Sequence, residues 1–149
     1  MASYDTFGKF YDAVMGDRAQ ATERIRGFIR KARPKAKNVL ELACGTGSVL
    51  KHLSKHYEVW GLDLSKQMLS VARKKVPHAR LSRQNMVTFH LRQRFDVICC
   101  VFDSINHIAS FTDWKFLFGN VHQHLSDGGV FIFDINTLKV LDRHIAEPA

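Results

Sequence analysis

The stretch VLELACGTGSVL, residues 39–50, decides the fold. A short apolar run leads through small residues at alternate positions, Ala43, Gly45 and Gly47, into an amphipathic stretch. This pattern predicts a buried strand, a tight turn and a helix. Small residues in the turn let the backbone approach a ligand closely. Because ligands of open α/β sheets bind at the carboxyl ends of the strands, we expect a site at the end of this first strand.

Outward from this stretch, short apolar runs alternate with longer amphipathic ones, which predicts an α/β fold with a mainly parallel sheet. The predicted strands are residues 38–42, 59–62, 79–83, 95–101 and 130–133, with a glycine turn at 126–129 before the last. The predicted helices are residues 4–15, 17–33, 48–56, 65–75 and a stretch around 114–125. In the second of these helices we expect Ile25, Phe28 and Ile29 to face inward.

Two acidic residues end the first two predicted strands. Asp63 follows Glu41 by 63 − 41 = 22 residues, and an acid about 20 residues past a glycine turn is placed to bind ribose hydroxyls. Dinucleotides and S-adenosylmethionine (SAM) both use this arrangement. A pyrophosphate favours a third glycine, where this chain has Ser48, and Glu41 would repel it. SAM carries an ammonium and a sulfonium, which a carboxylate attracts, so the residues favour SAM over NAD.

These motifs resemble the class I SAM-dependent methyltransferases, in particular the small-molecule branch of that superfamily. The family's first motif reads acidic-x-Gly-x-Gly-x-Gly, and ELACGTG at 41–47 matches it with Ala43 in place of the first glycine. The resemblance continues through residues 95–108 and 125–136, and residues 7–15 resemble the family's helix that folds over the cofactor. It implies a Rossmann-like, doubly wound sheet in the order 3-2-1-4-5, counting strands along the chain.

The resemblance also implies which side chains hold SAM. They are Tyr11, Glu41, Ala43, Cys44, Gly45, Gly47, Asp63, Leu64, Met68, Asn85, Met86 and Phe102. Among them Leu64 and Met68 would pack around the adenosine. Asn85 stands where the family usually has an aspartate, and would accept a bond from the adenine amine through its side-chain oxygen.

The implied reaction is methyl transfer from SAM to a nitrogen or oxygen nucleophile of a small-molecule acceptor. Orientation of the reactants carries most of such a reaction, and a base is needed only to remove the acceptor's proton. The candidates for catalytic roles are Tyr11, which would close over the methyl donor, and His107, which can take a proton. Tyr11 can instead pack on the core, and His107 can be an ordinary surface residue. Asp103, which follows the fourth predicted strand, can line the acceptor pocket or cap the next turn.

The chain is predicted to form one SAM-binding domain. Its expected parts are an N-terminal helical lid segment at 1–37, a Rossmann-like core at 38–137 and a tail at 138–149. The family usually continues with two more strands, so we expect the cofactor-binding portion of a longer protein or an abbreviated relative. A bare fifth strand predicts a homodimer through its edge or through the tail, unless Leu138, Leu141 and Ile145 fold back over the sheet.

Two other functions stay open. A SAM-binding module without turnover fits the short C-terminus. An RNA or DNA methyltransferase fits the net charge of +8, but no aromatic residues alternate with the basic ones, as base stacking would require. The Asn/Asp-Pro-Pro-aromatic motif of many nucleic-acid enzymes is also replaced by FDSI at 102–105. A nucleic-acid partner is therefore not favoured.

Composition sets the remaining expectations. No apolar run approaches the roughly 20 residues that span a bilayer, and no secretory signal begins the chain, so we expect no membrane partner. The cysteines Cys44, Cys99 and Cys100 form no disulfide framework, which favours the reducing cytoplasm. His52 and His56 lie four apart but lack a third ligand, so no metal site is expected.

Overall fold

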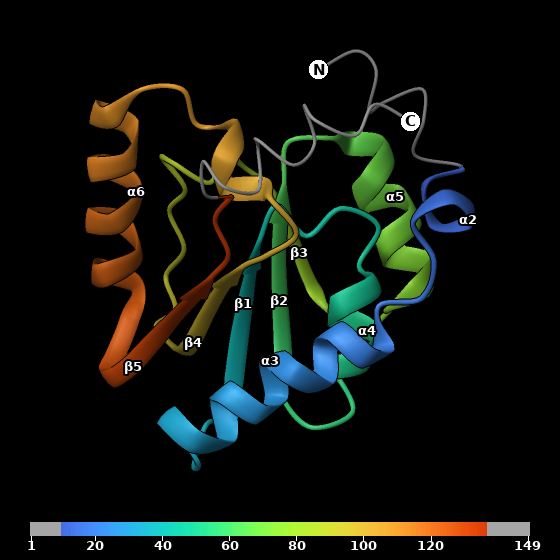
Figure 1. Ribbon diagram of the computed structural model, residues 1–149, viewed down its shortest axis with the longest axis horizontal. Helices are drawn as coiled ribbons and strands as arrows, with labels where there is room; N and C mark the ends of the chain where they lie inside the picture. The colour runs from blue at the N-terminus through green and yellow to red at the C-terminus, as the bar shows by residue number, and fades with distance from the viewer. Residues whose placement is uncertain (1–9, 137–149) are drawn as a thin grey trace.

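The computed structural model describes residues 10–136 and shows a five-stranded parallel sheet with helices on both faces (Figure 1). The strands are β1 Asn38–Leu42, β2 Glu58–Asp63, β3 Arg80–Arg83, β4 Phe95–Cys100 and β5 Leu125–Phe133. The helices are α2 Tyr11–Met15, α3 Ala19–Ala32, α4 Ser48–Leu53, α5 Lys66–Lys75, the 3-10 helix η1 Ser104–His107 and α6 Phe111–His124. The sheet order is β3-β2-β1-β4-β5, which confirms the predicted fold.

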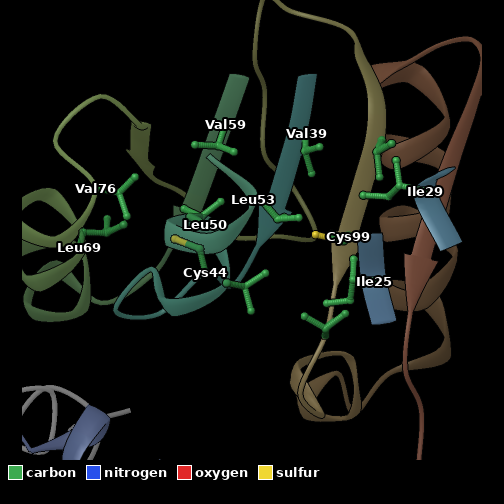
Figure 2. Close-up of a cluster of buried hydrophobic side chains, with 13 residues drawn as sticks. Ile25, Ile29, Val39, Cys44, Leu50, Leu53, Val59, Leu69, Val76 and Cys99 are labelled. Atoms are coloured by element: carbon green, nitrogen blue, oxygen red, sulfur yellow. The ribbon is translucent and has the colours of Figure 1, made fainter. Parts of the chain in front are cut away.

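The two faces of the sheet bury separate apolar clusters. Along β1, Val39 belongs to one cluster, whereas Leu40 and Leu42 belong to the other, as alternation along a strand requires. Helices α3, α4 and α5 cover the first face, and Figure 2 shows side chains from these helices meeting those of the strands. Helix α6 covers the second face through Leu117 and Val121. With both faces covered, the central strands are mainly apolar, and the buried Glu41 of β1 is an exception.

The predicted inward position of Phe28 is wrong, because this side chain is 61% exposed. The buried stripe of α3 runs through Thr22, Ile25 and Ile29. Phe28 comes one residue before Ile29, so its side chain points about 100° around the helix from that stripe. Phe116 of α6 precedes the buried Leu117 in the same way and is 62% exposed.

The predicted turn at 126–129 is a bulge inside β5. Phe95 pairs with Leu125, and Val97 pairs with Val130. An advance of two residues along β4 therefore corresponds to an advance of five residues along β5. Gly128 lies in this bulge at φ +72°, a backbone conformation that glycine adopts without strain. Gly128 and Gly129 therefore lie inside β5, whereas the sequence predicts a turn that ends before the strand begins.

Strand β5 is an edge of the sheet, since within residues 10–136 it pairs with β4 alone. Phe131 stacks on Phe133 with ring centroids 5.0 Å apart, and both rings meet Phe118 of α6 edge to face. Phe133 and Phe118 are each 39% exposed. The tail, with its alternative of folding back over the sheet, lies outside the described residues. Within the described part, no helix is long and apolar enough to cross a membrane.

We expect the chain to associate as a dimer through this edge, because an exposed apolar edge strand pairs readily with another chain. Light scattering at several concentrations should show a mass that rises toward twice that of the monomer. Phe133→Lys should shift the equilibrium toward the monomer. Phe116→Lys should not, because this exposed aromatic of α6 lines a surface hollow with Val87 and Thr88 and not with β5. A monomer at all concentrations up to about 1 mM would contradict the expectation.

Candidate functional site

A cavity of about 380 Å³ opens at the carboxyl ends of the parallel strands, where the sequence predicts a binding site. Its volume falls in the range of small-molecule sites. The residues predicted to bind or act that line it are Tyr11, Ala43, Gly45, Asp63, Leu64, Met68, Met86, Phe102 and His107. These residues come from five separate segments of the chain, so the fold assembles the cavity from distant parts of the sequence.

The loop after β1 forms one wall of the cavity in a left-handed backbone conformation. Ala43 has φ +53° and Gly45 has φ +54°. A Cβ built on Gly45 would have no atom within 4 Å, so this position faces open space. The backbone N–H of Cys44 donates to the carbonyl of Leu62 at 2.9 Å, which ties the loop to β2. The cavity wall at Gly45 is thus bare backbone, open to a ligand.

Gly47 serves packing and not the cavity. A Cβ there would lie 3.1 Å from the Cβ of Ala72 and 3.6 Å from Cγ2 of Val76. Its φ of +77° also sets the start of α4. This glycine therefore lets α4 and α5 approach each other, and it does not line the cavity.

Asp63 is fixed at the floor of the cavity by two backbone donors. The N–H of Gly45 donates to Oδ2 at 2.8 Å, and the N–H of Ser65 donates to Oδ1 at 2.9 Å. Ser65 in turn caps α5, accepting from the N–H of Met68 at 3.2 Å. Each carboxylate oxygen has a further lone pair, so Asp63 can accept two more hydrogen bonds from a ligand.

Glu41 lies behind the cavity, in the interior of the sheet. In register it stands between Gly61 of β2 and Cys99 of β4, and it is only 3% exposed. Among the described residues its Oε2 has no hydrogen-bond partner. Burial, and after it the charge of Asp63, raises the pKa of Glu41 well above its ordinary value. A buried carboxyl oxygen without a partner is rare, and a cation bound nearby would favour the charged form of Glu41 and lower its pKa again.

Two further predicted cofactor residues do not line the cavity. The buried Cys44 side chain points to β2, since a Cβ on Gly61 would lie 2.8 Å from its Sγ. Burial, followed by the charges of Glu41 and Asp63, raises the pKa of this thiol well above its ordinary value. Asn85 is exposed, and its side-chain oxygen accepts from the N–H of Val87 at 2.8 Å, which stabilises its own turn.

The cavity also has lining residues that sequence reasoning missed, namely Leu62, Ser65, Gln84 and Ser104. Gln84 accepts from the N–H of His90 at 2.8 Å and donates to Oγ of Ser82 at 2.8 Å, so it supports the loop after β3. All four follow or end a parallel strand. Position at the carboxyl end of a strand is the signal that would have found them.

The turn after β4 carries Phe102 to the cavity in a left-handed conformation, with φ +60° followed by +67° at Asp103. The carboxylate of Asp134 holds this turn, accepting from the N–H of Phe102 at 2.7 Å and of Asp103 at 3.0 Å. The guanidinium of Arg18 lies 4.0 Å from the Phe102 ring centroid. Asp103 itself accepts from Asn106 and does not line the cavity. The roles of Asp134 and Arg18 had no sequence signal.

The sheet order, the cavity at the strand ends and the anchored Asp63 define a Rossmann-like domain with a small-molecule site. A family model for the methyltransferase domain matches residues 39–129. The chain belongs to this family, the class I SAM-dependent methyltransferases.

Individual relatives agree with this assignment. The dTDP-3-amino-3,4,6-trideoxy-alpha-D-glucopyranose N,N-dimethyltransferase of Streptomyces venezuelae is 31% identical over 131 residues, 87% of this chain and 55% of the relative. The SAM-bound structure of an amino pentose methyltransferase from Micromonospora echinaspora superposes with a TM-score of 0.81 at 30% identity, covering 85% of this chain and 56% of that one. A SAM-dependent methyltransferase from Clostridium acetobutylicum gives 0.80 at 34% identity, covering 91% and 58%. The chain spans about half the length of the curated relatives it matches.

Proposed function

We propose that this chain binds SAM in the cavity and takes part in transferring its methyl group to an amine of a small-molecule acceptor. The observation that carries the proposal is Asp63, held by the N–H groups of Gly45 and Ser65 at the floor of the cavity. A carboxylate fixed in this way accepts both hydroxyls of a ribose.

The other residues around the cavity fit the rest of SAM. Gly45 leaves open space for the ligand, and Leu64, Met68 and Met86 offer an apolar surface for an adenine ring. The buried Glu41 would favour the positive charges of the methionine part, which a pyrophosphate lacks. These features support SAM over a dinucleotide.

Bound SAM supplies a methyl group on a sulfonium, which is already a good leaving group. The protein therefore has to orient the donor and the acceptor and to exclude water. Tyr11 and His107 line the same cavity and are the candidates for contact with the acceptor. An amine reacts only without its extra proton, and a ring nitrogen of His107 can take that proton.

An amino sugar is the acceptor class that the relatives favour. The Streptomyces venezuelae relative is named for N,N-dimethylation of a dTDP-linked amino sugar, and so is a relative from Streptomyces fradiae that is 33% identical. A nitrogen acceptor of this kind is therefore preferred here over an oxygen acceptor. Cytoplasmic localisation also stays a proposal, which rests on three buried free thiols.

Binding and turnover can be tested on one sample. We expect titration calorimetry to show heat with SAM and none with NADH, because the residues around Asp63 disfavour a pyrophosphate. Transfer of a labelled methyl group to a dTDP-linked amino sugar should follow. Binding without transfer would favour the module without turnover, and detectable NADH binding at micromolar protein would contradict the cofactor assignment. Tight, salt-dependent binding to RNA or DNA would instead favour a nucleic-acid methyltransferase.

A further inference from the structure

Helix α2 brings Tyr11 to the cavity, yet none of the five residues of this helix is buried. Val14 is 65% exposed and Met15 is 44% exposed. A helix of five residues has little stability of its own, and most helices are held by packing of an apolar face. Polar contacts therefore contribute to holding α2 in place.

Those contacts converge on Asp12, the residue after Tyr11. Its Oδ1 accepts from the hydroxyls of Thr46 at 2.6 Å and Ser48 at 3.1 Å. Its Oδ2 accepts from Nζ of Lys75 at 2.5 Å. Burial acts to raise the pKa of Asp12, but the bonds from Lys75 and the two hydroxyls outweigh it and lower that pKa. The charged carboxylate is the form that these contacts stabilise.

Lys75 completes the arrangement from the last turn of α5. Its ammonium also donates to Oγ1 of Thr46 at 3.1 Å and to Oγ of Ser48 at 2.9 Å. Its three N–H bonds thus have three oxygen partners, and each hydroxyl both accepts from Lys75 and donates to Asp12. We call these four residues the Lys75 network. Its donors and acceptors are matched, so the ammonium and both hydroxyls have partners.

The Lys75 network is connected to the cavity at two points of the chain. Tyr11 and Gly45 line the cavity, and each is followed by a network residue, Asp12 and Thr46. Thr46 is 1% exposed, so the network joins α2 to the interior of the domain. Next to α2, Gly16 has φ +71° and ψ −176°, a conformation essentially restricted to glycine.

We infer that Asp12 and Lys75 are positioning residues that hold the Tyr11 segment across the cavity and so set how slowly bound SAM dissociates. They act through Tyr11 and the loop at Gly45, and neither lines the cavity itself. The inference rests on the proposed function. The side chain of Lys75 is 18% exposed and that of Asp12 is 39% exposed. A partly exposed ion pair contributes modestly to folding, so the test also follows the stability of each variant.

The test measures SAM dissociation by loading the protein with tritiated SAM and chasing with unlabelled SAM. Lys75→Met should raise the dissociation rate by about tenfold or more, the factor expected when a hydrogen bond to a charged group is lost. Lys74→Met is the matched control, since it removes the same charge from an exposed neighbour in the same helical turn and should change the rate less than about twofold.

A second variant and a double mutant guard against effects on folding. Asp12→Asn keeps the size of the side chain and should also speed dissociation. Combined with Lys75→Met it should add little, because both changes break the same bond. Thermal melting should place all variants close to the wild type. Wild-type dissociation should also accelerate with salt more than that of the variants, since salt screens a partly exposed pair.

The outcomes separate the two proposals. A wild-type protein that binds no SAM would overturn the proposed function, and this inference with it. A wild type that binds SAM while Lys75→Met, Asp12→Asn and Lys74→Met dissociate at the same rate would overturn the inference alone. Faster dissociation in the first two variants, with melting unchanged, would establish the positioning role.

Discussion

Replacing Gly45 with valine should abolish SAM binding. The residue has φ +54°, and a Cβ there would point into open space at the cavity wall. A branched side chain would fill volume that the ligand needs, and β-branched residues are strongly disfavoured in this left-handed region. Both effects act on the same loop, so we expect no heat in titration calorimetry with SAM.

Gly45→Ala separates filling of the cavity from strain in the loop. Ala43 already has φ +53° in this loop, which indicates that the backbone tolerates alanine in a left-handed conformation. We therefore expect Gly45→Ala to fold and to bind SAM more weakly than the wild type but measurably. Circular dichroism should show that the valine variant is folded. A folded Gly45→Val protein with wild-type affinity would show that the ligand does not approach this backbone.

Asp63→Ala should weaken SAM binding by roughly 2–4 kcal/mol, the value of one or two charge-assisted hydrogen bonds. That is about a 30- to 900-fold rise in the dissociation constant. Part of the loss is local, because the N–H groups of Gly45 and Ser65 lose their acceptor and the loop loses its anchor. Titration calorimetry measures the change directly.

Two controls make this result specific. Asp127→Ala removes the same charge from an exposed position of β5, near the end of the sheet opposite the cavity, and should leave affinity unchanged. Asp63→Asn keeps one acceptor oxygen and should fall between the wild type and Asp63→Ala. Equal affinities for the wild type and Asp63→Ala would remove Asp63 from the proposed site.

The fold could be predicted because its signals are local. β1 and β4 are mainly apolar, as expected for strands buried on both faces, although each contains one acidic residue, Glu41 or Asp96, and a glycine turn follows β1 directly. The acid at the end of β2 falls at a fixed spacing from that turn. The inward position of Phe28 is wrong because this residue lies next to the buried stripe of α3. Apolar periodicity alone does not separate a residue at the border of such a stripe from one inside it.

The rest of the site depends on contacts between distant segments. Asp12 and Lys75 are 75 − 12 = 63 residues apart, and Asp134 holds a turn at Phe102 that precedes it by 134 − 102 = 32 residues. Aspartate and lysine occur on most exposed surfaces, so their type carries no signal. The resemblance predicts that Asn85 contacts the adenine, and this stays a prediction; in the structure its side-chain oxygen accepts from the N–H of Val87 in its own turn.

The all-parallel sheet has a consequence for how the protein folds. Among strands β1 to β5, no neighbouring pair can start from a tight hairpin, because parallel strands need a crossover between them. The central pair, β1 and β4, joins Val39 to Val97 across 97 − 39 = 58 residues, and such loop closure is entropically costly and slow. A nascent chain that ends before β4 already contains the glycine loop and Asp63 but lacks the Phe102 wall. Because Phe102 follows β4 in the chain, this wall of the cavity forms only after β4 has been synthesised, and we expect ligand binding to appear later than strands β1 to β3.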